Sequence, residues 1–91
     1  MLPIFWRVSA RNSLASIIVF ISGHNPQAAR HMRDLMETSI MPAAEHPHLF
    51  RTGRVAGTRE IVAHPNYVLV YYVINDRIEV CAAGGNYGSA D

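Results

Sequence analysis

Three arginines, Arg51, Arg54 and Arg59, stand close together just before a stretch that carries acid–base side chains. Glu60 and His64 follow, and tyrosines come after them at positions 67, 71 and 72. Guanidinium groups bind phosphate and stabilise charge on a reacting phosphoryl group, while histidine and tyrosine can transfer protons. A phosphodiester-cleaving site can therefore be built from Arg54, Arg59, His64 and a tyrosine. Strand alternation would place Glu60 and His64 on one face.

The same residues fit other uses equally well. Arginines around a loop can hold the phosphates of a nucleic acid, but a net charge of +1 lacks the basic stripe of a dedicated binder. Tyrosine on a sheet and histidine before proline are also ordinary packing and turn residues. The apolar surplus, which includes four Met and the pair Leu49-Phe50, is typical of a surface that a partner covers. From the residues alone, a protein-binding module is favoured.

Composition restricts the remaining possibilities. A chain of 91 residues that is about half apolar forms one folded domain. All eight basic residues are arginine. This bias reflects either a GC-rich gene, in which arginine codons replace lysine codons, or selection for the planar guanidinium, which binds carboxylate and phosphate with two hydrogen bonds. The single cysteine, Cys81, excludes an internal disulfide, and the five histidines lack zinc-ligand spacing. We therefore expect no metal and no cofactor.

The N-terminus lacks the charged start and long apolar core of a signal peptide. The apolar run Ile17–Ile21 is far too short to span a bilayer. The sequence therefore predicts a cytoplasmic protein without membrane association.

The N-terminal half predicts one strand and a pair of helices. Partial alternation over Leu2–Ser9 indicates a strand, with Trp6 as a core or sheet-face residue and ligand stacking as its alternative use. A helix should follow over Ala10–Ser22, and Asn25-Pro26 should cap and begin a second helix that runs to Ile40. The apolar stripes that these helices should bury are Leu14, Ile17, Ile18 and Ile21, and Ala29, Met32, Met36 and Ile40.

The C-terminal half predicts a loop and three strands. Met41–Gly53 should be a loop whose Leu49 and Phe50 fold down onto the core. The expected strands are Thr58–His64, Tyr67–Ile74 and Arg77–Ala82. The middle strand is apolar on both faces and should be central. The predicted fold class is α+β, in the order β-α-α-β-β-β, with an antiparallel sheet and a helix hairpin on one face. Residues 1–82 should form the domain, and 83–91 an irregular tail.

Several motifs resemble the ParE toxins of the RelE/ParE superfamily, the toxin halves of bacterial type II toxin–antitoxin modules. The motifs are Trp6, Asn25-Pro-Gln-Ala-Ala29, Glu45-His-Pro47, Gly53-Arg-Val-Ala-Gly-Thr-Arg-Glu-Ile61, and Asn66-Tyr followed by Tyr71-Tyr-Val. They cover roughly residues 1–80 in order, and the family's fold has the element order predicted above.

This resemblance implies a toxin that poisons DNA gyrase and forms a hetero-oligomer with a cognate antitoxin, which covers its apolar groove and sheet. It implies no catalytic residue and no sequence-specific DNA binding by this chain alone. The alternatives are a RelE-like ribonuclease that cuts mRNA on the ribosome, and a non-toxic binding module. Candidates for contact with target or antitoxin are Arg51, Arg54, Arg59, His64, Tyr67 and Tyr71. Candidates for the apolar antitoxin groove are Leu14, Ile18, Met32, Met36, Leu49 and Phe50.

The sequence departs from the family after Val80. The family usually continues into Val-x-His-x-x-Arg-Gln-aromatic-Pro, whereas this chain continues Cys-Ala-Ala-Gly-Gly-Asn-Tyr-Gly-Ser-Ala-Asp, with no His or Arg beyond Arg77. We hypothesise that a frameshift has replaced the native C-terminus and that the chain is an attenuated variant. Sequencing the gene decides this, because one shifted frame near codon 81 must encode the basic run.

Overall fold

The computed structural model describes residues 1–86. Its elements are β1 (Ile4–Trp6), α1 (Val8–Ser22), α2 (Pro26–Ser39), α3 (Met41–Glu45), β2 (Arg51–Thr52), β3 (Thr58–His64), β4 (Tyr67–Ile74) and β5 (Arg77–Gly85). The strands form one sheet in the order β1-β5-β4-β3-β2. β1 runs parallel to β5, and the other neighbouring pairs are antiparallel. The predicted α+β class is confirmed, and β4 is the central strand. The predicted order lacked α3 and β2, and the sheet is not antiparallel throughout, because β1 pairs parallel to β5.

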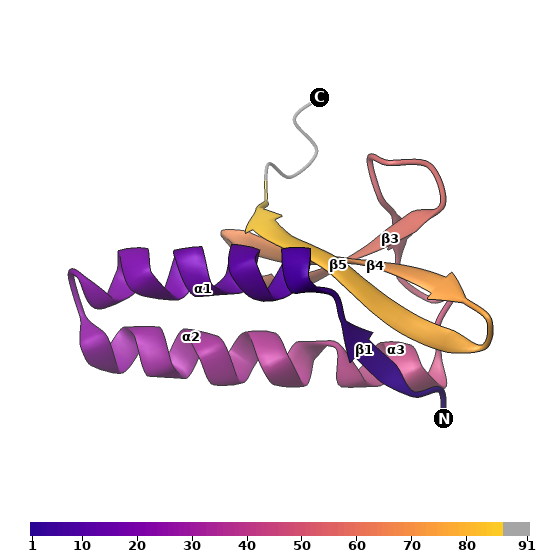
Figure 1. The fold of residues 1–91 in the computed structure, drawn as a ribbon, viewed down its shortest axis with the longest axis horizontal. Helices are drawn as coiled ribbons and strands as arrows, with labels where there is room; N and C mark the ends of the chain where they lie inside the picture. Colours follow the sequence, from indigo (N-terminus) through magenta and orange to yellow (C-terminus); the bar gives the residue numbers. More distant parts are fainter. Residues whose placement is uncertain (87–91) are drawn as a thin grey trace.

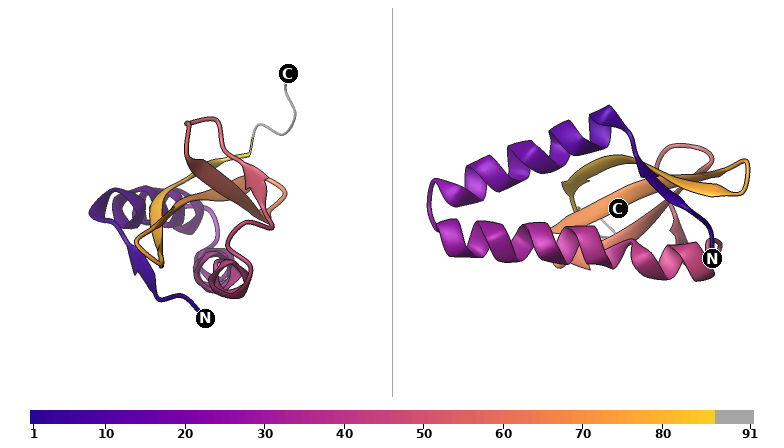
Figure 2. Two further views of the ribbon diagram at one scale, coloured as in Figure 1. Left: turned by 90° about the vertical axis from the view of Figure 1, so that its right-hand side faces the viewer. Right: turned by 60° about the horizontal axis from the view of Figure 1, so that its bottom comes forward.

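The helices lie on one side of the sheet, where α1 and α2 form an antiparallel hairpin (Figures 1 and 2). The loop between β2 and β3 rises from the opposite side of the sheet (Figure 1). The core fills the space between the helices and the sheet. It includes Leu14, Met32, Met36, Ile40, Ile61, Leu69, Tyr71, Ile78 and Val80.

The two long helices follow the predicted stripes. Asn25 caps α2 through its Oδ1, which accepts a hydrogen bond of 3.0 Å from the Ala28 N–H, and Pro26 occupies the first turn. The α2 stripe is fully buried, while the α1 stripe beyond Leu14 packs partly buried against the core. The predicted strand over residues 2–9 is too long, because Val8 and Ser9 already belong to α1. β1 ends early since only Ile4–Trp6 find partners on β5.

The predicted loop over residues 41–53 was wrong in part, because it contains the helix α3 and the short edge strand β2, which pairs with β3. Pro42 ends α2 but sits in the first turn of a further helix, α3, where its missing N–H costs nothing. Phe50 packs against the core as predicted. Leu49 does not, since 72% of it is exposed.

β5 continues through Gly85, three residues beyond its predicted end at Ala82, so the irregular tail does not begin at residue 83. Sequence periodicity is absent there, but β4 supplies the pairing: Leu69, Val68 and Tyr67 lie opposite residues 83, 84 and 85. The remainder of the predicted tail, residues 87–91, lies outside the described part of the chain.

Candidate functional site

Arg59 and Tyr71 lie opposite each other on β3 and β4 and fasten the segment that leads into β2. The Tyr71 hydroxyl donates a 2.7 Å hydrogen bond to the Pro47 carbonyl oxygen. The Arg59 guanidinium donates to the carbonyl oxygens of Phe50 at 2.7 Å and His48 at 3.2 Å. Burial raises the pKa of the Tyr71 phenol, against the lowering influence of Arg59. Both predicted contact residues therefore hold the fold together.

Arg51 and Arg54 gather around the buried carboxylate of Glu60. Arg51 donates to Glu60 Oε1 from Nη2 at 2.9 Å and from Nε at 3.2 Å. The backbone N–H of Arg54 donates to Oε2 at 3.4 Å. Arg51 also donates to Asn86 Oδ1 at 3.2 Å. A carboxylate with 7% exposure requires such partners, so Glu60 organises the two arginines.

His64 lies at the other end of β3. The β3–β4 register shifts between Val62 and His64, and His64 pairs with Tyr67, whose ring centroid is 6.0 Å away. His64 Nδ1 accepts a 3.0 Å hydrogen bond from the Asn66 N–H, which makes it a turn residue. The predicted shared face of Glu60 and His64 was wrong, because the extra residue in the strand reverses the alternation.

The side chains of the hypothetical phosphodiester-cleaving site, which are Arg54, Arg59, His64 and a tyrosine, thus lie in different parts of the sheet. Arg54 approaches Glu60 on the sheet face away from the core, whereas Arg59 reaches back to segment 48–50. Arg59 and His64 are five residues apart on β3, about 16 Å at the usual rise per residue. These side chains do not form one acid–base site.

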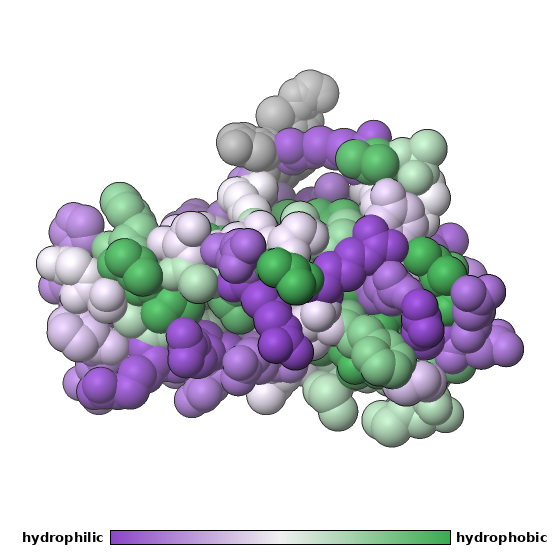
Figure 3. Space-filling view, in the orientation of Figure 1, coloured by the Kyte–Doolittle hydropathy of each residue, from purple (hydrophilic) through white to green (hydrophobic). Residues whose placement is uncertain are grey.

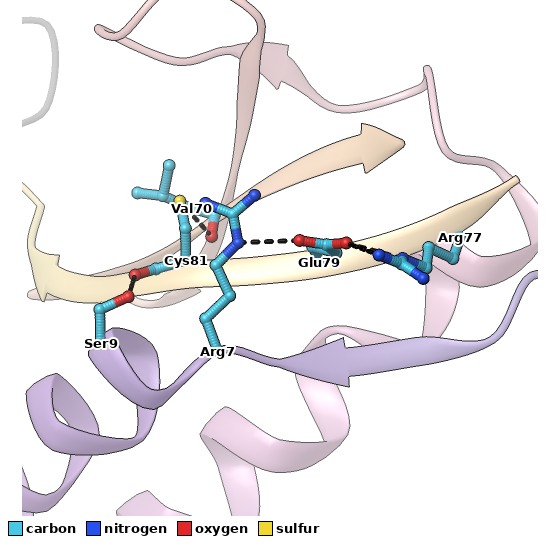
Figure 4. Close-up of polar contacts among 6 residues, drawn as sticks. All are labelled: Arg7, Ser9, Val70, Arg77, Glu79 and Cys81. Carbon is cyan, nitrogen blue, oxygen red and sulfur yellow. Dashed lines mark hydrogen bonds and ion pairs between the residues drawn. The ribbon is translucent and has the colours of Figure 1, made fainter. Parts of the chain in front are cut away.

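A cluster that the sequence did not predict lies across β1, β4 and β5 (Figure 4). Glu79 accepts hydrogen bonds from Arg7 Nε at 2.8 Å and Arg77 Nε at 2.6 Å. The Arg7 guanidinium lies 4.9 Å from the Tyr72 ring centroid, and that of Arg77 lies 5.3 Å from the Phe5 ring centroid. Arg77 and Glu79 are neighbours on one face of a single strand, whereas Arg7 and Phe5 join them only through the parallel pairing of β1 with β5, for which the sequence has no local signal.

The charges within this cluster support one another. The hydrogen bond from Arg7, and then that from Arg77, lower the pKa of Glu79, and the Glu79 hydrogen bond raises the pKa of Arg7. Beside it, Ser9 Oγ donates 2.7 Å to the Cys81 carbonyl oxygen, fixing the start of α1 to β5. The cluster carries one net positive charge on the sheet face away from the helices.

The predicted groove residues differ in accessibility. Met36 is fully buried, and Leu14 and Met32 retain only 7% and 8% exposure, so all three serve mainly this chain's own core. Ile18 and Phe50 are partly buried at the edge of the core, and Leu49 is exposed. The hydrophobic surface in view is divided into separate patches by hydrophilic side chains (Figure 3). Other large apolar residues that are exposed include Phe5, Val8, Val19 and Phe20.

Two cavities lie on the surface of the described part of the chain. One of about 410 Å³ lies between the helices and β1 and includes Trp6, Arg11 and Arg33 in its wall. The other, about 260 Å³, lies beside the β2–β3 loop and includes Arg54, Glu60 and Val70. Within residues 1–86, no three His, Cys, Asp or Glu side chains gather closely enough to hold a metal ion. No helix of this part of the chain is long and apolar enough to cross a membrane.

The fold is similar to that of solved ParE/RelE-like toxin structures. The chromosomal ParDE toxin–antitoxin system of P. aeruginosa contains a chain that matches with a TM-score of 0.79 at 16% identity, covering 93% of this chain and 96% of that one. A copper-bound mutant toxin from Helicobacter pylori matches with a TM-score of 0.65 at 17% identity, covering 93% and 94%.

Sequence comparison identifies the family. The model of the ParE toxin of the type II toxin–antitoxin system parDE matches residues 4–83. Toxin RelE2 of Caulobacter vibrioides is 31% identical over 80 residues, which cover 88% of this chain and 90% of that protein. The chain belongs to the ParE toxin family of type II toxin–antitoxin systems. As the toxin of such a module, it has an antitoxin as its partner.

Proposed function

We propose that this toxin acts on DNA gyrase in the cytoplasm, stalling gyrase–DNA cleavage complexes, and that a cognate antitoxin neutralises it in a hetero-oligomer. The observation that carries the proposal is the placement of the residues that could have formed a ribonuclease site. Tyr71 is buried and bonded to Pro47, Arg59 is bonded to two loop carbonyls, and His64 caps a turn. Their tasks are structural, which favours action by binding a target over cleavage of RNA.

A RelE-like ribonuclease is the second candidate, and two observations favour it. Toxin RelE2 is among the relatives, and the resemblance to the superfamily implies that RelE-type members cut RNA with basic and tyrosine side chains on the sheet. Arg7, Arg77 and Tyr72 provide such side chains on the face away from the helices. Phosphoryl-transfer charge could be stabilised there if RNA lay across the cluster.

Parallel assays separate the two candidates. Purified toxin is added to a gyrase supercoiling and cleavage assay and to an in-vitro translation assay. We expect loss of supercoiling and accumulation of cleaved DNA, with translation unaffected. Inhibition of translation with untouched gyrase would overturn the proposal. An Arg7→Met variant then tests the ribonuclease candidate. It should abolish translation arrest only if RNA binds to the cluster around Glu79.

We further propose that the antitoxin covers the accessible apolar residues Ile18, Leu49 and Phe50 together with neighbouring sheet surface. Apolar surface of this kind is what partners bury. Co-expression with the protein encoded by the adjacent reading frame should raise the soluble yield of the toxin. An unchanged yield, together with a monodisperse lone toxin, would count against this coverage. We propose that the toxin alone does not bind DNA sequence-specifically. A mobility-shift assay with the toxin alone should therefore show no sequence-specific complex.

Attenuation through the altered C-terminus is a separate proposal. We expect weak growth arrest when the chain is induced in a bacterial host without antitoxin. We expect stronger arrest when residues from Cys81 onward are replaced by the run that the family usually carries. Equal arrest by both chains would dismiss attenuation and leave the gyrase proposal unaffected.

A further inference from the structure

The larger cavity, about 410 Å³, has an aromatic wall and charged side chains around it. Trp6 at the end of β1 and Leu14 on α1 supply apolar surface, while Arg11, Arg33 and Glu37 come from the two helices. Its volume lies in the range of cavities that hold ligands or anchoring side chains. Because α1 and α2 run antiparallel, the first turns of α1 face the second half of α2 across it.

The charges around this cavity are not balanced. The guanidinium groups of Arg11 and Arg33 form no hydrogen bond or ion pair with any residue from 1 to 86. Glu37 lies one turn after Arg33 on α2, but no ion pair joins them, and this order of charges along a helix is the weaker one. The guanidinium groups of Arg11 and Arg33 and the single carboxylate of Glu37 therefore leave the cavity with one net positive charge.

Trp6 has unused binding capacity as well. It packs against the core while remaining only half-buried. Its indole N–H, a donor only, donates to no acceptor in the described residues. Tryptophan with an apolar body and a free donor is a frequent anchor of protein interfaces.

We propose that this cavity is a docking point for an acidic segment of the antitoxin. An apolar side chain of that segment packs against Trp6 and Leu14, and an adjacent carboxylate binds between Arg11 and Arg33. Glu37 disfavours a polyanion such as a nucleic acid but tolerates one carboxylate, so charge complementarity selects an acidic peptide. The inference rests on the proposed neutralisation by an antitoxin and specifies its chemistry.

The chemical part can be tested with small probes, because Trp6 is the only tryptophan and its fluorescence reports the cavity directly. The full chain is titrated with 4-phenylbutyrate and with the neutral, nearly isosteric 4-phenylbutanamide. We expect the carboxylate to bind at least about three-fold tighter, the effect of one partly exposed ion pair. The preference should vanish in the double variant Arg11→Glu, Arg33→Glu. Equal binding of both probes, or no fluorescence change, would overturn the proposed anion site.

The partner is tested by measuring antitoxin affinity for the same variants. Each charge reversal should weaken binding about three- to ten-fold. Arg30→Glu is the matched control, because it makes the same change on α2 outside the cavity. Circular dichroism should confirm folding, and Glu is favourable in the first turn of α1.

The outcomes remain distinguishable from those of the proposed function. Antitoxin that binds the wild-type toxin and both variants equally overturns the docking point and leaves neutralisation intact. Variants that keep antitoxin affinity but lose their effect on gyrase assign the cavity to gyrase and also overturn it. Antitoxin that fails to bind the wild-type toxin defeats both proposals, while the two probes still decide whether the cavity selects an anion.

Discussion

The Tyr71 hydroxyl lies 2.7 Å from the carbonyl oxygen of Pro47, across 24 residues of chain. This bond joins the centre of the sheet to the segment that connects α3 with β2. Arg59 reinforces it through the neighbouring carbonyls of residues 48 and 50. A tyrosine that could have served a catalytic centre therefore anchors a loop.

Replacing Tyr71 by Phe should lower the free energy of unfolding by about 1 kcal/mol, because one hydrogen bond is lost while the ring still fills the core. Urea denaturation measures this. Tyr72→Phe is the matched control, since the Tyr72 hydroxyl bonds to no residue from 1 to 86, and should change stability by less than about 0.5 kcal/mol. A Tyr71→Phe protein of unchanged stability that loses toxicity would make Tyr71 a functional residue instead.

Replacing Glu79 by Gln should make stability less dependent on pH in the acid range. Arg7 and Arg77 lower the pKa of Glu79 in the folded state below its ordinary value of 4.5. A lowered folded pKa means that the stabilisation is present above the ordinary value and is lost as the pH falls through the folded one. The stability difference between wild type and variant should therefore be largest near neutral pH and shrink below 4.5. Urea midpoints across this range test it, with the exposed Glu45→Gln as control.

Replacing Gly53 by Ala should destabilise the β2–β3 connection. An added Cβ would overlap Thr58 Oγ1 and come within 3.1 Å of Thr58 Cβ, and Thr58 is buried with 3% exposure. Overpacking of this kind costs about 1–3 kcal/mol. Gly84→Ala meets nothing within 4 Å and should be close to neutral. Thermal unfolding that shows equal effects for both variants would contradict the close approach at Gly53.

Cys81 should react slowly in the folded protein. Burial raises the pKa of its thiol, and its Sγ lies 3.5 Å from the Val70 carbonyl oxygen. Because the thiolate is the reactive form, iodoacetamide should modify the native chain more slowly than the urea-unfolded chain at mildly alkaline pH. Mass spectrometry follows the single site. Equal rates in the two states would show that the strand around Cys81 opens readily.

Some turn and helix signals that depend on neighbouring residues predicted the structure correctly, although the short helix α3 was missed. Asn25-Pro26 begins α2 as predicted. Asn75-Asp76, the two residues between the predicted strands Tyr67–Ile74 and Arg77–Ala82, form the turn, with φ of 50° and 60°, as a two-residue hairpin requires. The apolar character of Tyr67–Ile74 predicted the central strand, because a strand with a neighbour on each edge and the core on one face has little need of polar side chains.

Features that depend on residues distant in the sequence could not be predicted from such local signals. The end of β5, the shift before His64 and the exposure of Leu49 each depend on which chain segment lies alongside. The same holds for the candidate site, where Arg51 and Arg54 meet at Glu60 while Arg59 binds the segment before β2. Arg51 turns to Glu60 and Arg59 to the carbonyls before it, because a buried carboxylate and unpaired carbonyls both require donors.

The sequence by itself determined the helix hairpin and the three long strands after it, since local periodicity and caps encode them, and its motifs carried the resemblance to the family. Only the tertiary structure decided that Tyr71 and Arg59 serve the fold, that Glu79 joins Arg7 to Arg77, and that Trp6 faces a cavity with Arg11 and Arg33. The physical reason is that these contacts join residues that are far apart in the chain. Their side chains become buried and paired only when the folded sheet brings those residues together.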